Sequence, residues 1–266
     1  MITDPGSSRV KAVTRLTQKD ARQETGLFLL EGPQGLKELT QYPEIVHEVF
    51  VTEAAAERYA ELLESLREQN CSIEIVSDKV MDKLSETKTP QGVVAVVHQQ
   101  HVDLADVLDS SPRLLAVLDR IQDPGNAGTI LRAADAAGVD GVLFSAESVD
   151  VYNGKVVRST AGSLLHVPVV TGLSLPEALA QIREKGLQIL IADAGGTPIT
   201  QLSQQFLVKP TAWVFGNEAG GVDPQLASLA DQVVSIPIYG SAESLNLATA
   251  ASICVYTSAF AQRSAR

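Results

Sequence analysis

The chain of 266 residues is long enough for one large or two ordinary domains, and its hydrophobic content of 45% can fill a core. Its net charge of −11 argues against non-specific nucleic-acid binding through the overall field, because an acidic surface repels phosphates. No apolar run reaches the roughly 18 residues of a membrane helix, and the first residues lack the hydrophobic segment of a signal peptide. We therefore expect a cytoplasmic globular protein with no membrane partner.

Neither cysteines nor histidines predict a metal site or a disulfide. Cys71 and Cys254 lie far apart and have no ligand spacing around them. His98 and His101 are close in sequence, but no acidic or cysteine partner stands at ligand spacing, so a solvated linker explains them better than a metal does.

Positive charge gathers at the start of the chain. Residues 1–22 contain five basic residues against two acidic ones, a local net charge of +3 in a chain that is otherwise acidic. Arg15, Lys19 and Arg22 follow helical spacing within this stretch. Two interpretations stay open, a solvated helix face and a small surface that contacts phosphates.

The first hundred residues predict a small α/β domain. In chain order we expect a helix over 9–24, a strand over 26–31, a helix over 36–41, a strand over 46–51, an amphipathic helix over 53–69, a strand over 73–76, a helix over 77–84 and a strand over 92–97. We assign residues 1–97 to this domain and residues 98–112, which are polar and acidic, to a linker.

The remainder, residues 113–266, alternates strictly between strands and helices. Strands are expected over 114–118, 142–145, 165–170, 187–192, 212–215 and 233–238, and helices over 126–137, 151–159, 175–185, 224–230 and 245–262. Such alternation predicts a mostly parallel sheet that is covered on both faces. The second domain is therefore an α/β domain of the nucleotide-binding type.

The loops after three of these strands carry the polar residues of interest. No GxGxxG, GxxxxGK[ST] or GxSxG pattern occurs, so dehydrogenase, P-loop and esterase functions lose most of their support. Strand 114–118 is followed by a turn at Asp123-Pro-Gly, by Asn126, which can cap the next helix, and by Arg132 one and two-thirds turns later. Because ligands bind at the carboxyl ends of parallel strands, these loops predict one shared pocket.

Each polar residue also has a purely structural explanation. Arg132 can be a surface or ion-pairing residue, Glu218 can cap a turn, and Ser244 and Asn246 can cap the last helix. A fixed guanidinium in a cleft binds phosphate or carboxylate in fork geometry. Three polar loops that converge at strand ends make the structural explanations less satisfactory together than singly.

Three motifs in order resemble those of one family. They are Asn126-x-Gly128-x-x-x-Arg132, Gly216-Asn217-Glu218, and Ile236-Pro237-Ile238 followed by Ser244-Leu245-Asn246. Together they closely resemble the motifs of the SpoU, or TrmH-like, RNA ribose 2′-O-methyltransferases of the SPOUT superfamily, over the whole C-terminal half. Segments 26–32 and 89–97 are similar to the family's N-terminal substrate-binding domain, which is related to a ribosomal-protein fold.

The resemblance implies a fold, a cofactor and partners. The fold is α/β, with a C-terminal SPOUT trefoil-knot domain after a small ribosomal-protein-like RNA-binding domain. The cofactor is S-adenosylmethionine, the substrate is RNA, the assembly is a homodimer, and no metal is required. A separate N-terminal domain favours large-subunit (23S) ribosomal RNA over transfer RNA, which is the main alternative substrate.

Site residues are carried over by position. The catalytic set is Arg132, Asn126, Glu218, Ser244 and Asn246. The cofactor-binding set is Phe215, Gly216, Asn217, Ile236, Ile238, Leu245 and Asn246. The RNA-binding set combines Arg132 with Arg15, Lys19 and Arg22, which come from the basic stretch at the start of the chain and not from the resemblance. Since arginine keeps its proton at neutral pH, we prefer the hypothesis that Arg132 stabilises the ribose oxygen as it attacks, over a role as the base.

Two functions of other classes compete with this one. A non-catalytic, ribosome-associated RNA-binding factor could keep both domains, but it would not need Arg132, Glu218 and Asn246, which are all present. A nucleotide-dependent oxidoreductase could use the same type of sheet, and the missing glycine fingerprint disfavours it.

Overall fold

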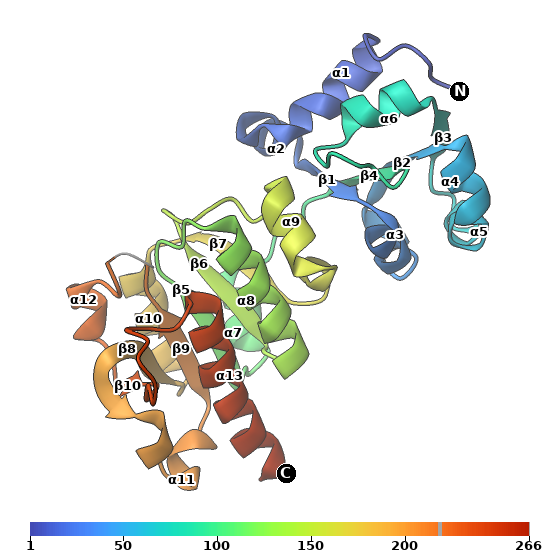
Figure 1. Ribbon diagram of the computed structural model, residues 1–266. Helices are drawn as coiled ribbons and strands as arrows, with labels where there is room; N and C mark the ends of the chain where they lie inside the picture. Colours follow the sequence, from blue (N-terminus) through green and yellow to red (C-terminus); the bar gives the residue numbers. More distant parts are fainter. Residues whose placement is uncertain (218–219, 266) are drawn as a thin grey trace. The chain divides into compact units, whose positions relative to one another are not determined.

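The computed structural model describes residues 1–217 and 220–265, and the chain forms two compact units (Figure 1). The first unit contains Met1–Gln100 together with Asp150–Gly162, and the second contains His101–Val149 together with Ser163–Arg266. A segment from the C-terminal half of the sequence therefore belongs to the first unit. The domain boundaries predicted from the sequence, at residues 97 and 113, do not assign this segment to the first unit.

The first unit is built on a four-stranded mixed sheet. Its strands are β1 (Leu27–Glu31), β2 (Val46–Thr52), β3 (Ile73–Val76) and β4 (Val93–His98), in the order β1-β4-β2-β3. β4 is antiparallel to both of its neighbours, and β2 is parallel to β3. Its helices are α1 (Ser8–Thr14), α2 (Lys19–Thr25), α3 (Pro33–Leu39), α4 (Glu53–Arg58), α5 (Ala60–Glu68), α6 (Asp78–Leu84) and α9 (Gly154–Thr160).

Helices cover both faces of this sheet because its strands are apolar on both sides. Phe50, Val94 and Val96 pack in one cluster with buried residues of α1 and α6. On the opposite face α3 packs against β1 and β4. Every residue of β4 except the last is buried, as the unbroken apolar run predicts.

The helix expected over 9–24 is interrupted in the structure. A 3-10 turn, Arg15–Thr17, separates α1 from α2, and Gln18 is extended with φ −97° and ψ 137°. The hydroxyls of Thr14 and Thr17 donate to the carbonyls of Val10 and Thr14, so these side chains compete for backbone partners at the break. The helical spacing of Arg15, Lys19 and Arg22 is lost as a result.

The second unit contains a six-stranded sheet in which all neighbouring strands are parallel. The strands are β5 (Leu114–Leu118), β6 (Gly141–Ser145), β7 (Val169–Leu173), β8 (Gln188–Pro198), β9 (Thr211–Phe215) and β10 (Gln232–Ser235), in the order β10-β8-β9-β5-β6-β7. The helices are α7 (Leu104–Asp109), α8 (Pro124–Ala137), α10 (Leu175–Glu184), α11 (Gln204–Leu207), α12 (Pro224–Ala227) and α13 (Leu247–Ser264). The predicted α/β class and its parallel sheet are confirmed.

Two layers of helices enclose this sheet (Figure 1). Buried residues of α7, α10 and α12 share one apolar cluster with one face of the strands. α8 and α13 pack side by side on the other face, where Trp213 of β9 donates a hydrogen bond of 2.9 Å to Ser258 of α13. This bond satisfies the indole N–H of a fully buried tryptophan.

Two predicted segments differ from the structure. The stretch 98–112, expected to be a linker, contains α7, because Leu104, Val107 and Leu108 form an apolar stripe that joins the core of the second unit. The strand expected over 165–170 is shifted, since residues 163–165 form a 3-10 turn and β7 begins only at Val169. In the described part of the chain, no helix is long and apolar enough to cross a membrane.

Candidate active site

Three loops meet at the carboxyl edge of the parallel sheet. They follow β5, β9 and β10, and contain the three sequence motifs. Leu118 pairs in register with Phe215, so the first two loops leave neighbouring strands at the same level. The backbone N–H of Asp119 then donates to the carbonyl of Phe215 at 2.8 Å. The convergence expected from strand order is confirmed for the loops after β5 and β9.

One side-chain hydrogen bond joins the first motif to the third. The amide nitrogen Nδ2 of Asn246 donates to Oδ1 of Asn126 at 2.9 Å, across 120 residues of sequence. The Oδ1 atom of Asn246 also accepts from the backbone N–H groups of Ala248 and Thr249. Asn246 therefore caps α13 and contacts the first motif at the same time.

The first motif is capped by another residue than expected. Oδ1 of Asp123 accepts from the backbone N–H of Asn126 at 2.7 Å, and α8 begins at Pro124. Asp123 is thus the N-cap, and the prediction that Asn126 caps this helix is wrong. Because its backbone is bound by Asp123, the Asn126 side chain is left to interact with Asn246.

The second motif forms a tight loop. The backbone groups of Asn217 and Gly221 exchange hydrogen bonds of 3.0 and 2.9 Å. A Cβ atom on Gly216 would lie 2.2 Å from the carbonyl carbon of Gly221, so only glycine fits there. Glu218, the acidic residue of this motif, lies outside the described residues.

Arg132 lies exposed on α8. It makes no hydrogen bond or ion pair with any residue that the structure describes, while its neighbours Ile130 and Leu131 are buried. The sequence led us to expect a guanidinium fixed in a cleft, and in the described parts no partner fixes it. Its side chain is therefore accessible to a molecule from outside this chain.

The third motif presents apolar side chains at the surface. Ile236 is half-buried, whereas Ile238 is 38% and Leu245 is 36% exposed. Ser244 and Asn246 are exposed beside them. Phe215, by contrast, is fully buried and stacks on Trp213, so only its backbone can contact a ligand.

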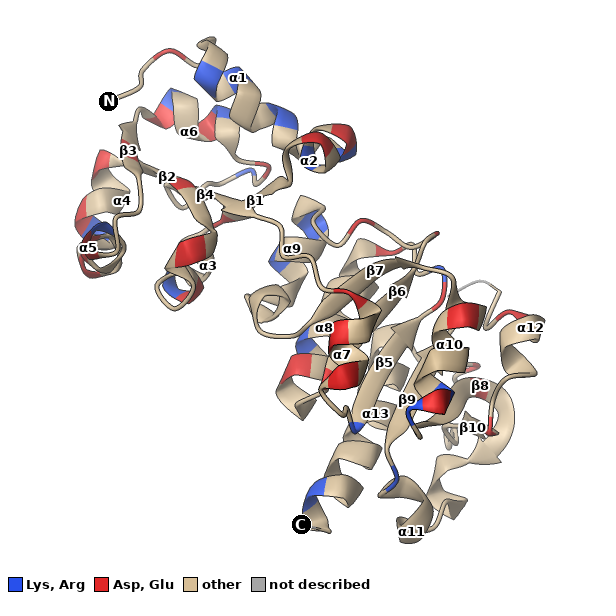
Figure 2. Cartoon of the chain, turned by 180° about the vertical axis from the view of Figure 1, so that it is seen from behind, with Lys and Arg blue, Asp and Glu red and all other residues tan. Residues whose placement is uncertain are grey.

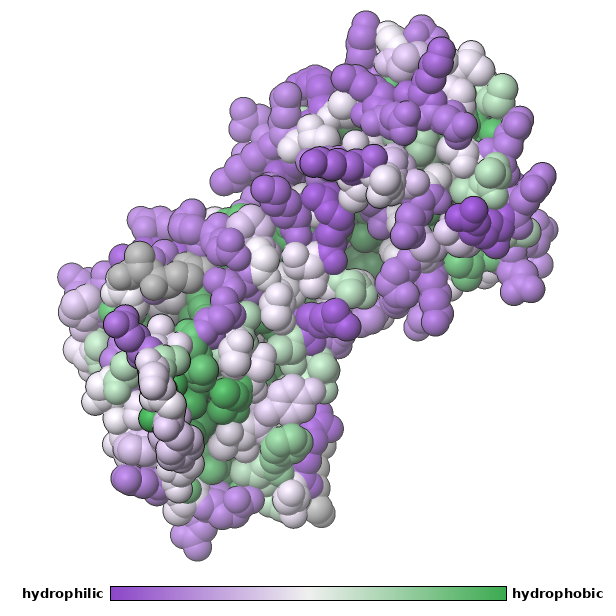
Figure 3. Space-filling view, in the orientation of Figure 1, coloured by the Kyte–Doolittle hydropathy of each residue, from purple (hydrophilic) through white to green (hydrophobic). Residues whose placement is uncertain are grey.

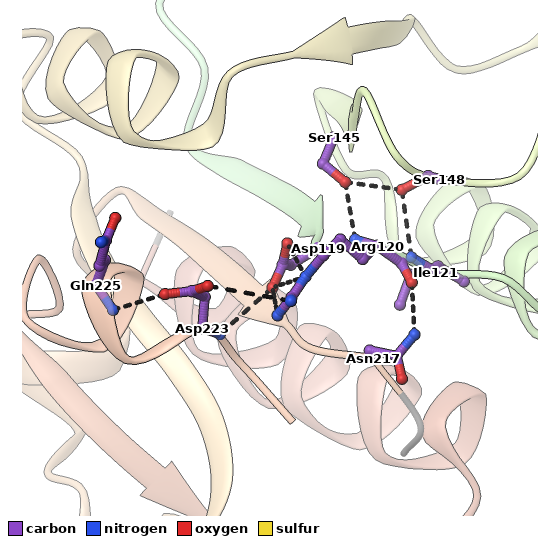
Figure 4. Close-up of polar contacts among 8 residues, drawn as sticks. All are labelled: Asp119, Arg120, Ile121, Ser145, Ser148, Asn217, Asp223 and Gln225. Carbon is purple, nitrogen blue, oxygen red and sulfur yellow. Dashed lines mark hydrogen bonds and ion pairs between the residues drawn. The ribbon is translucent and has the colours of Figure 1, made fainter. Parts of the chain in front are cut away.

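Arg120 occupies a central position that the sequence analysis missed (Figure 4). Its φ is +53°, a left-handed conformation that side-chain-bearing residues seldom adopt. Its backbone N–H donates to Oγ of Ser145 at 2.8 Å, and its carbonyl accepts from Nδ2 of Asn217 at 2.7 Å. The strained backbone is thus held from both sides, and it orients the Asn217 side chain of the second motif.

The Arg120 guanidinium faces two carboxylates. Its Nη2 atom lies 2.9 Å from Asp119, which is 4% exposed, and Nη1 lies 4.0 Å from Asp223. The hydrogen bonds that Arg120 donates to Asp119, and then the charge of that carboxylate, raise the pKa of Arg120 above its usual value. These residues line a cavity of about 360 Å³. The signal in the sequence is a charged pair, Asp119-Arg120, directly after a buried strand.

The four residues predicted to bind RNA do not share one environment. Arg22 is 2% exposed, and its guanidinium binds Asp150 at 2.6 Å and the carbonyl of Leu16 at 2.8 Å. A buried, paired guanidinium has no free edge for a phosphate, so the assignment of Arg22 to the RNA surface is corrected. Arg15, in the 3-10 turn before α2, and Lys19, at the start of α2, are exposed.

Two parts of the chain match known protein families. Residues 113–256, more than half of the chain, match the SpoU rRNA Methylase family. The chain belongs to this SpoU family. Residues 7–95 match the MRM3-like substrate binding domain, which accounts for most of the first unit. Among the residues of this SpoU chain that the structure describes, no group of three or more His, Cys, Asp or Glu side chains is placed to hold a metal ion.

Relatives of this SpoU chain extend over almost its full length. The 23S rRNA (guanosine(2553)-2'-O)-methyltransferase RlmP of Bacillus subtilis (strain 168) is 35% identical over 251 residues, which cover 94% of this chain and 95% of the relative. The AdoMet-bound rRNA methyltransferase from Sinorhizobium meliloti is 28% identical, with a TM-score of 0.84 over 97% of this chain and 96% of that one. The SpoU methyltransferase AviRb from Streptomyces viridochromogenes, in complex with the cofactor AdoMet, is 29% identical, with a TM-score of 0.84 over 98% of this chain and 100% of that one.

Proposed function

We propose that this protein is an S-adenosylmethionine-dependent RNA methyltransferase that methylates a ribose 2′-hydroxyl of large-subunit ribosomal RNA. The observation that carries the proposal is the 2.9 Å hydrogen bond from Asn246 to Asn126, which joins the third family motif to the first. The relative from Bacillus subtilis, named for this reaction, matches both units of the chain and not the SpoU part alone.

The loops fit a nucleoside-bearing cofactor. Ile238 and Leu245 offer an exposed apolar wall of the kind that encloses an aromatic ring. Gly216 lets the second motif pack directly against the backbone of Gly221, which fixes the shape of the loop that would hold the cofactor. When bound, the cofactor supplies an activated methyl group. Ile236, Asn217 and the backbone of Phe215 complete the set that would hold it.

The polar residues are suited to holding the ribose that accepts the methyl group. The attacking oxygen must be aligned and its developing negative charge stabilised. Arg132 is exposed, positively charged and without a partner in the described chain, so its guanidinium can contact that oxygen or the neighbouring phosphate. Asn126 and Asn246 fix each other and orient the ribose, and Ser244 lies exposed next to them. Glu218 completes the proposed set.

The RNA chain itself contacts the first unit. Arg15 and Lys19 are exposed there, and the Arg15 ion pair with Glu24 is long at 3.4 Å and lies at the surface. Such a surface pair is weak and exchanges readily for a phosphate. We place the protein in the cytoplasm, with its ribosomal RNA substrate.

A homodimer through α13 completes the proposal. This helix is almost free of charge along its length (Figure 2), and hydrophobic side chains gather over it (Figure 3). Ile253 is 36% and Phe260 is 65% exposed, seven residues apart on one helix face, and the Phe260 ring lies 5.3 Å from that of Tyr256. An apolar strip of this kind is suited to a second copy of the same helix. The trefoil knot implied by the family also stays part of the proposal.

Calorimetry with S-adenosylmethionine tests the assignment. We expect binding in the presence of EDTA, together with a rise in melting temperature that grows with cofactor concentration. NAD serves as the control for a nucleotide-dependent oxidoreductase and is expected to cause no shift. Binding of NAD in preference to S-adenosylmethionine would reject the methyltransferase.

A further inference from the structure

A second cavity lies in the first unit, whereas the methyl-transfer motifs belong to the second. It has a volume of about 360 Å³ and opens where β1 ends and β4 begins. Its walls come from the loop after β1, from the loop 85–91 and from Arg158 of α9. We call it the β1 pocket. Its size is within the range of pockets that hold a small organic ring system.

The wall of the β1 pocket is fixed by an ionic network. Arg158 lies 3.2 Å from Glu31 and 3.0 Å from Glu86. Glu31 also accepts hydrogen bonds from the backbone N–H of Glu86 and the hydroxyl of Thr87. The network ties β1, the loop 85–91 and α9 together. Because two carboxylates face the single Arg158 guanidinium, the network carries a net charge of −1, and the wall does not attract a phosphate.

Two side chains with hydrogen-bonding capacity remain available in the pocket. Thr89 and Gln91 are exposed and form no side-chain hydrogen bond with the described residues. A Cβ on Gly32 would lie 3.7 Å from Oε1 of Gln91, so the amide of Gln91 lies over the bare backbone of Gly32, whose φ is +90°. A free amide beside a glycine offers a donor and an acceptor to a flat ligand.

We infer that the β1 pocket binds one unpaired nucleobase of the RNA. An uncharged ring suits a wall that does not attract anions, and the donors and acceptors on its edge match the free groups of Gln91 and Thr89. Lys88 stands between Thr87 and Thr89, is exposed, and can contact the phosphate of the same nucleotide. This inference rests on the proposed function in that the substrate is RNA. It adds a site that reads a base in the first unit.

Oligonucleotide binding tests the inference directly. Fluorescence anisotropy is measured with labelled single-stranded RNAs of uniform sequence, one for each base, and with a ribose-phosphate oligomer of equal length that has no bases. Gln91→Ala is expected to weaken binding of at least one base-bearing RNA by about tenfold and to leave the base-free oligomer unaffected. Gln41→Ala, which removes another exposed glutamine of the same unit, is expected to change neither.

Two further variants separate recognition from folding. Gln91→Glu keeps the size of the side chain but loses its donor, so the order of preference among the four bases is expected to change. Lys88→Ala is expected to weaken binding of base-bearing and base-free oligomers alike, and to lower the salt slope by about one contact. Equal affinity of the wild type for base-bearing and base-free oligomers, or unchanged base preference in Gln91→Glu, would overturn the inference. The assay contains no methyl-transfer step, so its result is independent of the proposed activity.

Discussion

Arg132 is the residue on which the proposed chemistry depends most. Arg132→Ala is expected to lower the single-turnover rate of methyl transfer by about two or more orders of magnitude, because a charged transition-state donor is lost. Cofactor affinity should remain near the wild-type value, since the loops that would hold it are unchanged. Rapid-quench kinetics and calorimetry measure the two quantities. Arg67→Ala, which removes another exposed arginine, is the control, and near-normal transfer by Arg132→Ala would reject the assigned role.

Arg120 provides a test of backbone geometry. Glycine adopts its φ of +53° without strain, whereas alanine does not. Both Arg120→Gly and Arg120→Ala lose the ion pair with Asp119, so the difference between them isolates the backbone. We expect the glycine variant to be more stable than the alanine variant by about 1 kcal/mol in the free energy of unfolding, measured with urea. Equal stability of the two would contradict the left-handed conformation.

Individual residues differ in how far the sequence could reveal them. Asn126 and Asn246 were predicted as site residues from the resemblance of their motifs to those of the family, and the structure brings them into contact. Arg120 could not be predicted, because its left-handed backbone depends on Ser145 and Asn217, which are distant in sequence. The burial of Arg22 was missed for the same reason, since its partner Asp150 is 128 residues away.

Among the elements, the segment before β1 separates RNA binding from stability. Replacing Arg15 and Lys19 together by alanine is expected to lower the slope of RNA affinity against salt by about two phosphate contacts. Arg22→Ala should instead destabilise the first unit by about 3 kcal/mol, because it leaves the Asp150 carboxylate without its buried partner. Filter binding at several salt concentrations and urea unfolding measure these effects. The assignment fails if Arg22→Ala changes the salt slope while the double variant does not.

Element boundaries were predictable where local patterns decide them. The apolar runs of β4 and β5 lie within one residue of their predicted positions, because strands buried on both faces need continuous hydrophobicity. The break between α1 and α2 was not predicted, since threonine hydroxyls decide it through hydrogen bonds that periodicity does not report. The helix α7 was not predicted, because the acidic residues of this stretch obscured its apolar stripe. That stripe is buried only by packing in the core of the second unit.

On the scale of the whole molecule, segment 150–162 is the feature that sequence could not predict. It is encoded between β6 and β7 but is packed in the first unit, where Tyr152 donates to the carbonyl of Gln100 at 2.7 Å and lies 4.8 Å from the Phe28 ring. Burial raises the pKa of Tyr152 to about 12, in keeping with a phenol enclosed by packing. Which unit holds a segment depends on tertiary contacts and not on strand-helix alternation.

Assembly is the second question at this scale. Light scattering at micromolar concentration is expected to give twice the 28.3 kDa mass of one chain. Phe260→Lys places a charge on the exposed apolar face of α13 and should shift the protein toward the monomer. The control is Lys155→Glu, because Lys155 is exposed. A charge at Ile2 would not serve as a control, because Ile2 pairs with Val76. A monomer mass for the wild type over the whole concentration range would exclude the dimer.

Methyl transfer to ribose is tested most directly by mapping the modified nucleotide. Large-subunit ribosomal RNA from cells that lack the protein is incubated with S-adenosylmethionine and the purified enzyme, and is then cleaved with alkali, which cannot cut beside a methylated 2′-hydroxyl. We expect one position to become resistant with the wild type, and the resistance to be absent or greatly reduced with Arg132→Ala under the same conditions. Incorporation of methyl label without any alkali-resistant position would place the methyl group on a base and contradict the account.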